Sequence, residues 1–321
     1  MTRSKISQYR RLLQKEVAYC VTCQPYDDGP VWILGDETDI EELLSNLDVP
    51  AAAWAAVVSG VNCPNCGNAI ELGDVVGTKT AEELEWEHLQ HDWDRKLRRS
   101  FDQFQAHLER WPYLGLAHPI GRRIARSISR MRVIVIEDQP WYRARVPNEG
   151  RSFDTSDVMP PNPNEIAVPE GRYNHFGQSC FYLAGDKETA MQEALQGQAG
   201  IAWVQEFSVS RVESVLDLEP GPHGWVTPGL DLLSYGLTFG GYLEREVQRA
   251  AGWKPEYFVP RFVADCARHA GRAGIKFRSS RTYGSNLVLF SWGEPAIRPV
   301  GEPKIHQQKR SWSVFEGDPP F

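Results

Sequence analysis

Two Cys-x-x-Cys pairs near the N-terminus constrain the fold of this chain more than any other feature of its sequence. Cys20 and Cys23 form the first pair, and Cys63 and Cys66 form the second. Zn²⁺ prefers four ligands in a tetrahedron, and each Cys-x-x-Cys turn presents two thiolates from one tight loop. The spacing therefore predicts a structural zinc site made of all four cysteines, with a helix at residues 39–47 inserted between the pairs.

Two other interpretations of these cysteines fit the sequence less well. A redox Cys-x-x-Cys motif belongs with a thioredoxin-like βαβ pattern, and neither pair lies in such a pattern. Four unrelated buried cysteines would have no reason to share this spacing. Because no apolar stretch is long enough for a signal peptide or a membrane span, we expect a cytoplasmic protein, and a reducing compartment favours metal binding over disulfides.

The negative net charge of the chain does not suggest a protein that binds nucleic acid. The 321 residues include 35 Lys and Arg against 42 Asp and Glu, which gives a net charge of −7. A local exception lies at Arg122, Arg126 and Arg130, which are spaced to share one helix face. These arginines could contact phosphate or RNA, but a charge run is more often a solvated face paired with surface carboxylates. The sequence leaves a nucleic-acid partner open.

Composition and periodicity divide the chain into four segments, and together they predict an α+β protein. Residues 1–78 contain the predicted zinc-binding module. Residues 79–130 carry apolar residues at helical spacing behind a capping-box pattern at 80–83, which predicts a helical segment. Residues 131–300 mix strand and helix patterns. Residues 301–321 are polar and contain prolines, which predicts a flexible tail.

The pattern within the C-terminal half predicts several short elements. We expect strands at 133–136, 179–184, 201–209, 214–218 and 286–290, and helices at 186–195 and 257–270. No Gly-x-Gly-x-x-Gly, P-loop or Gly-x-Ser-x-Gly sequence is present, so the common nucleotide-binding folds and the hydrolase nucleophile elbow are not indicated.

Polar side chains recur in this half where the pattern predicts strands or strand ends. Arg143 follows the first expected strand, Tyr182 lies inside an apolar strand, and Glu193 lies on the following helix. Ser279 precedes the last expected strand. A set of Arg, Tyr, Glu and Ser side chains is unusual for a simple core, and it indicates a cleft in which the four side chains converge.

These residues belong to an ordered set of motifs that resembles the RES domain, a family named for its Arg, Glu and Ser. The motifs are Gly171-Arg-Tyr-Asn174, Phe181-Tyr-Leu-Ala184, Glu193, Phe277-Arg-Ser279 and Asn286-Leu-Val-Leu-Phe290, within residues 131–299. The resemblance implies a fold similar to ADP-ribosyltransferase toxins. It also implies NAD as substrate, since members of the family include NAD-consuming toxins of bacterial toxin–antitoxin pairs. Phe277 and Arg278 depart from the family pattern, in which Tyr and Pro are expected.

The resemblance implies roles for individual residues. The implied catalytic set is Arg143, Tyr182, Glu193 and Ser279. Glu193 would hold the ribose hydroxyls and stabilise an oxocarbenium-like transition state, and Arg143 would bind the pyrophosphate through two hydrogen bonds. Tyr182 would stack on the nicotinamide or its ribose, and Ser279 would orient Glu193 or bond to the substrate.

A further group of residues is expected to bind substrate. Its members are Arg172, Asn174, Ser280, Arg281 and Asn286, with Arg172 and Asn174 at the mouth of the cleft.

Three functions follow as hypotheses. The leading one is an NAD-degrading enzyme that cleaves the nicotinamide–ribose bond, either a glycohydrolase or a phosphorylase, acting as a toxin or a toxin-derived effector with an antitoxin protein over its cleft. The second is an ADP-ribosyltransferase that modifies a macromolecular target. The third is a non-catalytic module that senses a nucleotide through a zinc and helix scaffold.

The N-terminal cysteine pairs and helices also resemble a HEPN-like region found ahead of some RES domains. The distance from Arg99 to His107 is too long for the ribonuclease motif of that family, so we infer no nuclease.

Overall fold

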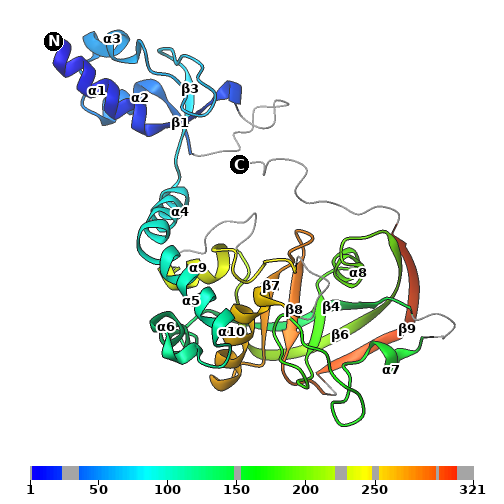
Figure 1. Ribbon diagram of the computed structural model, residues 1–321. Helices are drawn as coiled ribbons and strands as arrows, with labels where there is room; N and C mark the ends of the chain where they lie inside the picture. The colour runs from blue at the N-terminus through cyan, green and yellow to red at the C-terminus, as the bar shows by residue number, and fades with distance from the viewer. Residues whose placement is uncertain are drawn as a thin grey trace. The chain divides into compact units, whose positions relative to one another are not determined.

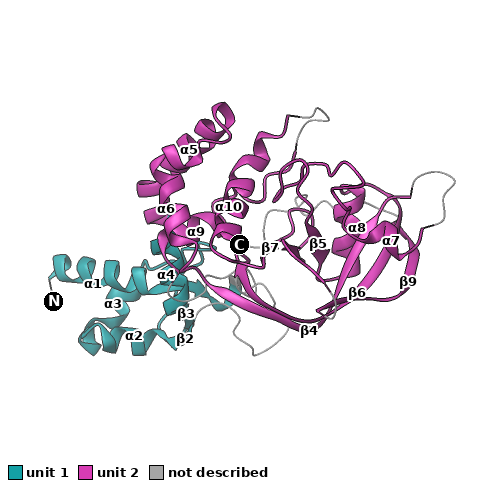
Figure 2. Ribbon diagram, turned by 90° about the horizontal axis from the view of Figure 1, so that it is seen from below, with its two compact units in different colours: residues 1–90 teal, residues 91–321 magenta. Residues whose placement is uncertain are grey.

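The computed structural model separates the chain into two compact units, Met1–Gln90 and His91–Phe321 (Figure 2). It describes residues 2–23, 36–147, 153–220, 230–247, 253–293 and 296–308. The side chain of Cys23 lies outside the described part. The first unit ends later than the boundary at residue 78 expected from the sequence, because the helix that follows begins with contacts to this unit.

The first unit combines short helices with a three-stranded antiparallel sheet of order β1-β3-β2 (Figure 1). Helix α2 (Ile40–Asn46) confirms the helix expected at 39–47. The other elements are α1 (Arg3–Glu16), β1 (Val17–Cys20), the 3-10 turns Val21–Cys23 and Ala51–Ala53, β2 (Asp36–Asp39), α3 (Trp54–Val58) and β3 (Val75–Thr78). Their core is aliphatic and includes the buried side chains of Leu13, Ile40, Leu44, Val57 and Val76.

Helix α4 (Ala81–Asp92) starts with the capping box that the sequence predicts. The backbone N–H of Thr80 donates to Glu83 Oε2 at 2.7 Å, and the backbone N–H of Glu83 donates to Thr80 Oγ1 at 3.1 Å. Glu83 also accepts a hydrogen bond from the hydroxyl of Tyr19 at 3.3 Å. The cap therefore satisfies helix donors and ties the first turn of α4 to strand β1.

The second unit begins with a helical layer, which is formed by helices from residues 93–127 and helices from residues 232–269. It consists of a π-helical turn (Trp93–Leu97), α5 (Arg98–Arg110), a 3-10 turn (Gly115–Ala117) and α6 (Pro119–Ser127), with α9 (Leu232–Phe239), the 3-10 turn Pro255–Tyr257 and α10 (Phe258–His269). Figures 1 and 2 show α5, α6 and α10 side by side.

Aromatic contacts hold this helical layer together. The rings of Phe104 in α5 and Phe262 in α10 are 5.2 Å apart. Trp93 lies so close to α9 that a Cβ on Gly236 would come within 2.0 Å of its ring. The helices α5 and α6 are thus packed against residues far along the chain, which bury their apolar faces.

The rest of the second unit is a six-stranded sheet of order β4-β5-β8-β7-β6-β9, with an additional pairing of β4 with β6. The strands are β4 (Val133–Arg145), β5 (Phe181–Ala184), β6 (Gly200–Asp217), β7 (Gly274–Arg278), β8 (Ser285–Leu289) and β9 (Ile297–Gln308). Only β6 and β7 pair in parallel. Helix α7 (Thr155–Val158) precedes β5, and α8 (Lys187–Leu195) connects β5 to β6.

Two expectations about this sheet were wrong. The strands expected at 201–209 and 214–218 form one continuous strand, β6, in which Ser214 has a φ of 58°. The tail expected from residue 301 begins as strand, since 301–308 belong to β9, and residues 309–321 lie outside the described part. Pro303 contributed to the expectation of a flexible tail, but in the described part of the chain β9 pairs only with β6, and an edge strand tolerates proline.

Candidate functional site

A cleft of about 810 Å³ lies where strands β4 and β5 meet. The two strands pair only through Tyr142 and Ala184. Residues of both strands, of α8 and of the loops around Arg172, Tyr257 and Ser280 line the cleft. The RES-like motifs, which are far apart in the sequence, therefore converge on one concave surface.

Helix α8 presents Glu193 to this cleft. The helix begins at Asp186, the expected N-cap, whose carboxylate accepts a hydrogen bond from the backbone N–H of Thr189 at 2.8 Å. Glu193 Oε1 accepts hydrogen bonds from Ser279 Oγ and from Asn286 Nδ2, each at 2.7 Å. The side chain of Glu193 remains 34% exposed. One carboxylate oxygen is thus fixed by two buried donors, while the carboxylate remains accessible from the cleft.

The hydrogen bonds of the Ser279 hydroxyl hold it against Glu193. Its Oγ accepts hydrogen bonds from the backbone N–H groups of Arg281 at 3.1 Å and Thr282 at 3.3 Å, and it donates to Glu193. A hydroxyl with these three partners has its proton directed at the carboxylate. Ser279 and Asn286 are therefore placed to orient Glu193, and Asn286, which the sequence placed among the substrate-binding residues, also lines the cleft.

Tyr182 and Asn174 form a second hydrogen-bonded group. The Tyr182 hydroxyl donates to Asn174 Oδ1 and accepts from the backbone N–H of Tyr173, both at 2.9 Å. Asn174 Nδ2 in turn donates to three backbone carbonyls of the loop 169–178, each at 3.0 Å. Burial raises the pKa of Tyr182 far above its usual value, so the phenol stays protonated. Its ring lines the cleft, whereas Asn174 is buried and holds the loop.

Arg143 projects from β4 into the cleft wall, with its guanidinium 5.3 Å from the centre of the Phe181 ring and with no ion pair among the described residues. Its Nη1 is buried and has no hydrogen-bond partner among the residues that the structure describes. Burial, and then the neighbouring charge of Arg145, lower the pKa of Arg143 to about 9. An unpaired buried cation is costly, so this position fits an anionic group of a ligand.

Arg145 is a cleft residue that the sequence reasoning missed. It lies two residues after Arg143 on the same strand, its Nε is also buried without a hydrogen-bond partner among the described residues, and burial lowers its pKa. The alternation of strand side chains could have identified it, because residues i and i+2 lie on one face. Two adjacent guanidinium groups make the cleft wall strongly attractive to anions.

Three other predicted binding residues, Arg172, Ser280 and Arg281, also lie at the cleft. Arg172 Nη1 donates to the carbonyls of Leu243 at 2.5 Å and Arg245 at 3.1 Å, and its Nη2 donates to Ser280 Oγ at 3.3 Å. Arg281 Nε lies 3.9 Å from Glu193 Oε2.

Two more lining residues were not among the binding residues expected from the sequence. Lys254 and Tyr257 lie at the cleft, and the centre of the Arg172 guanidinium is 5.3 Å from the ring centre of Tyr257. Among the cleft residues that the structure describes, the only carboxylate is that of Glu193, whereas Lys254 and the arginines supply several positive charges. The cleft can bind a polyanion and hold one carboxylate beside it.

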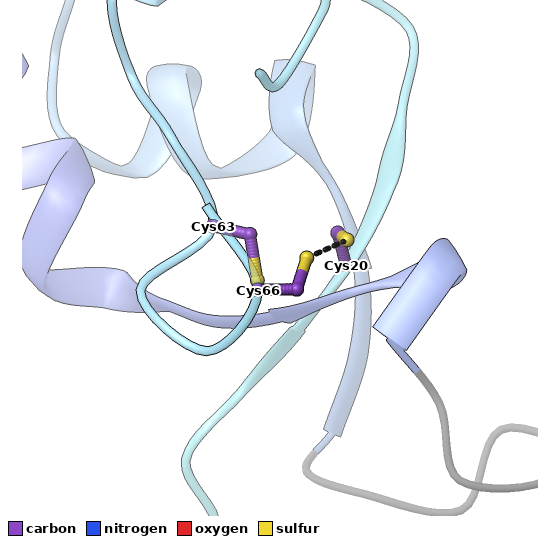
Figure 3. A group of neighbouring side chains, drawn as sticks. All are labelled: Cys20, Cys63 and Cys66. Carbon is purple, nitrogen blue, oxygen red and sulfur yellow. Dashed lines mark hydrogen bonds between the residues drawn. The ribbon is translucent and has the colours of Figure 1, made fainter. Parts of the chain in front are cut away.

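The first unit contains the predicted cysteine cluster. The sulfur atoms of Cys20, Cys63 and Cys66 lie within 4.8 Å of one another (Figure 3). Cys20 Sγ and Cys66 Sγ are 3.4 Å apart. The backbone carbonyl of Cys63 accepts a hydrogen bond from Gly67 N at 2.8 Å, and Gly67 has a φ of 79°, which closes the turn that presents both cysteines. Three converging thiols are a donor set that suits Zn²⁺.

The remaining expectations concern the fourth cysteine, the arginine stripe and the membrane. Cys23 ends the 3-10 turn after β1, and its side chain lies outside the described residues. Arg122 and Arg126 lie exposed on α6, and Arg130 lies in the turn after it; none of the three lines the cleft. Among the described residues, no helix has both the length and the apolar composition that a membrane span needs.

Comparisons with known proteins identify one domain. Residues 140–313 match the RES domain. Among solved structures, the crystal structure of the M. tuberculosis MbcT–MbcA toxin–antitoxin complex is similar, with a TM-score of 0.36, 13% identity, and coverage of 58% of this chain and 91% of that chain. A search of curated proteins finds no significant match.

Proposed function

Because the chain belongs to the RES domain family, we propose that it consumes NAD by cleaving the bond between nicotinamide and its ribose. The observation that carries this proposal is the Glu193 carboxylate, which Ser279 and Asn286 fix at the wall of a cation-lined cleft. Such an arrangement suits a substrate with two phosphates and a reaction that develops positive charge on a sugar.

The chemistry requires little acid catalysis. Nicotinamide in NAD is already cationic, so it leaves as a neutral base with the electron pair of its bond to the ribose carbon. The ribose carbon becomes oxocarbenium-like, and a preorganised carboxylate stabilises that charge. Glu193 would face this carbon or the neighbouring hydroxyls. Water as acceptor would give ADP-ribose and release one proton, and phosphate as acceptor would give a ribosyl phosphate.

The cations of the cleft would hold the rest of the substrate. Arg143 and Arg145 have unpartnered buried nitrogen atoms that a pyrophosphate could satisfy, because guanidinium groups bind phosphate oxygens with directed hydrogen bonds. The Tyr182 ring would pack against the nicotinamide half. Its hydroxyl is fully engaged within the protein, so its contribution would come from the ring face.

We further propose that the protein acts as a toxin and that an antitoxin protein covers the cleft. The family resemblance supports this part of the proposal. Induced expression of the wild type should arrest growth and lower cellular NAD, and the Glu193→Gln variant should do neither.

A separate proposal concerns the first unit. We propose that Cys20, Cys23, Cys63 and Cys66 hold a structural Zn²⁺, supported by the convergence of three of these thiols. Zinc held by four thiolates has no open position, so the metal would stabilise the unit and take no part in NAD cleavage.

The test of the main proposal is turnover of NAD by the purified full chain, with and without phosphate, resolved by chromatography. Glu193→Gln removes the charge and keeps the size of the side chain, and we expect turnover to fall at least about 100-fold. Glu188→Gln is the matched control, because Glu188 is exposed on the same helix and does not line the cleft.

The outcomes separate the candidate reactions. Nicotinamide released with ADP-ribose indicates hydrolysis, and release that depends on phosphate indicates phosphorolysis. Label from NAD that appears on an added protein indicates ADP-ribosyl transfer. Turnover by folded Glu193→Gln at the wild-type rate would contradict the assignment, and binding of NAD without turnover by the wild type would favour a sensing role.

A further inference from the structure

The turn between α5 and α6 exposes an apolar surface beside several arginines. Trp111, Tyr113, Leu114 and Leu116 are 43%, 88%, 53% and 58% exposed. We call these four residues, together with Arg110, Arg122, Arg123, Arg126 and Arg130, the α5–α6 surface. It precedes the residues that match the RES domain, and none of its members lines the cleft.

The arginines of the α5–α6 surface have no ion-pair partner in the described part of the chain. All five arginines are exposed. The sequence from residue 110 to residue 132 contains no Asp or Glu. A solvated face paired with surface carboxylates was the expectation for this stripe, and within the described residues the pairing is not observed. The surface is a local excess of positive charge on an acidic protein.

Contacts within the surface hold the charges next to the apolar side chains. Arg122 Nη1 donates to the carbonyls of Leu116 at 3.0 Å and Ala117 at 2.8 Å. The guanidinium of Arg110 lies 4.5 Å from the centre of the Trp111 ring. A hydrogen bond between His107 Nε2 and the carbonyl of Leu114, at 2.9 Å, also holds the turn against α5. The surface is therefore ordered before any partner arrives, which lowers the entropic cost of binding.

We propose that the α5–α6 surface docks a partner protein through an acidic amphipathic segment. Exposed Trp, Tyr and Arg side chains are the types that dominate binding energy at protein interfaces. Apolar side chains of the segment would cover Leu114 and Leu116, and its carboxylates would pair with Arg123 and Arg126, which have no ion-pair partner among the described residues. The proposal concerns a surface outside the cleft and does not depend on NAD turnover.

The geometry favours a protein over a single-stranded nucleic acid. Nucleic acids bind such surfaces by stacking bases on free aromatic faces. Here the guanidinium of Arg110 lies over the Trp111 ring, so Tyr113, which is 88% exposed, is the one aromatic side chain of the α5–α6 surface that is open for stacking. Leu114 and Leu116, 53% and 58% exposed, add aliphatic surface, for which bases are poor partners and the apolar side chains of a peptide are good ones.

The test is a selection from a display library of random 16-residue peptides on the immobilised full chain. Enriched peptides are then synthesised with a fluorescent label and titrated by anisotropy. We expect sequences that combine Asp or Glu with Leu, Phe or Trp, and affinities that weaken as salt is raised. A labelled oligouridylate of the same length, titrated in parallel, represents the nucleic-acid alternative.

Two variants test the surface itself. Arg123→Glu/Arg126→Glu and Leu114→Ser/Leu116→Ser should each weaken peptide binding at least about tenfold, whereas Arg298→Glu on the exposed strand β9 should not. Circular dichroism and NAD turnover establish that each variant is folded, since no altered residue lines the cleft. Selected peptides without an acidic and apolar character, equal binding by the surface variants, or tighter binding of the oligouridylate would each overturn the proposal.

Discussion

Replacement of Arg143 by Met should make the protein more stable and less able to bind substrate. The guanidinium of Arg143 is buried, and its Nη1 has no hydrogen-bond partner among the described residues. Met retains an unbranched side chain of similar length without the charge. Removal of a buried charge that has no ion pair among the described residues is favourable, because the native state no longer has to desolvate it, and Met can keep the contact with the Phe181 ring.

The size of the effect follows from the pKa. Lowering the pKa of Arg143 from 12.5 to about 9 corresponds to roughly 5 kcal/mol at about 1.4 kcal/mol per pKa unit, which is an upper limit. Water in the cleft and relaxation of the side chain reduce this value, so we expect a gain of about 1–3 kcal/mol. For a unit of this size, that gain raises Tm by at least about 2 °C.

The pH dependence of this gain has a defined sign. The folded-state pKa of Arg143 lies below its value in the unfolded chain, so the destabilisation by the charged guanidinium is fully present below about pH 9. It diminishes only as the pH rises above 9 toward the unfolded value. The difference in stability between wild type and Arg143→Met should therefore be constant from pH 6 to about pH 8.

Thermal and urea unfolding of both proteins would measure this difference, with Arg298→Met on the exposed strand β9 as control. ADP-ribose should raise the Tm of the wild type and have little effect on Arg143→Met, because the anion would neutralise a charge that only the wild type carries. A lower Tm for Arg143→Met would refute the reasoning, since it would mean that the guanidinium already stabilises the native cleft.

Three more predictions follow from individual contacts. Ser279→Ala removes a donor to Glu193 and should lower kcat about 10-fold or more with a smaller change in KM, which steady-state kinetics would measure. Tyr182→Phe keeps the ring but leaves Asn174 Oδ1 without its donor, and should cost about 1–3 kcal/mol in urea unfolding; an unchanged midpoint would contradict the network. Cys63→Ser should remove the bound zinc that elemental analysis finds in the wild type, and it should lower the Tm of the first unit; protein purified without zinc would contradict the metal site.

Local sequence signals predicted the helices of this protein well. The capping box at Thr80 and Glu83, the N-cap at Asp186 and the helix at 39–47 are all present in the structure. Each depends on residues a few positions apart, and such interactions are encoded locally. The extent of β6 and β9 was not predicted, because a strand is defined by its neighbours, and the turn-like residues of β9 are tolerated only at an edge.

The sequence predicted most of the residues that the structure brings together at the candidate site. The ordered motifs identified Arg143, Tyr182, Glu193 and Ser279, and all but Ser279 line the cleft, which Ser279 reaches through its bond to Glu193. Arg145 was not predicted, because a cation becomes part of a site only when the surrounding fold buries it without a partner.

The sequence by itself determined which residues are candidates for the chemistry, where the cysteine pairs lie and that the C-terminal half resembles a RES domain. Only the tertiary structure decided which hydrogen bonds these residues form and which of them are buried. It directs the Ser279 and Asn286 donors to Glu193 and the Tyr182 hydroxyl to Asn174. It also buries one guanidinium nitrogen of each of two β4 arginines without a hydrogen-bond partner among the described residues. Hydrogen-bond partners and desolvation depend on neighbours that are distant in the chain, and folding alone brings those neighbours together.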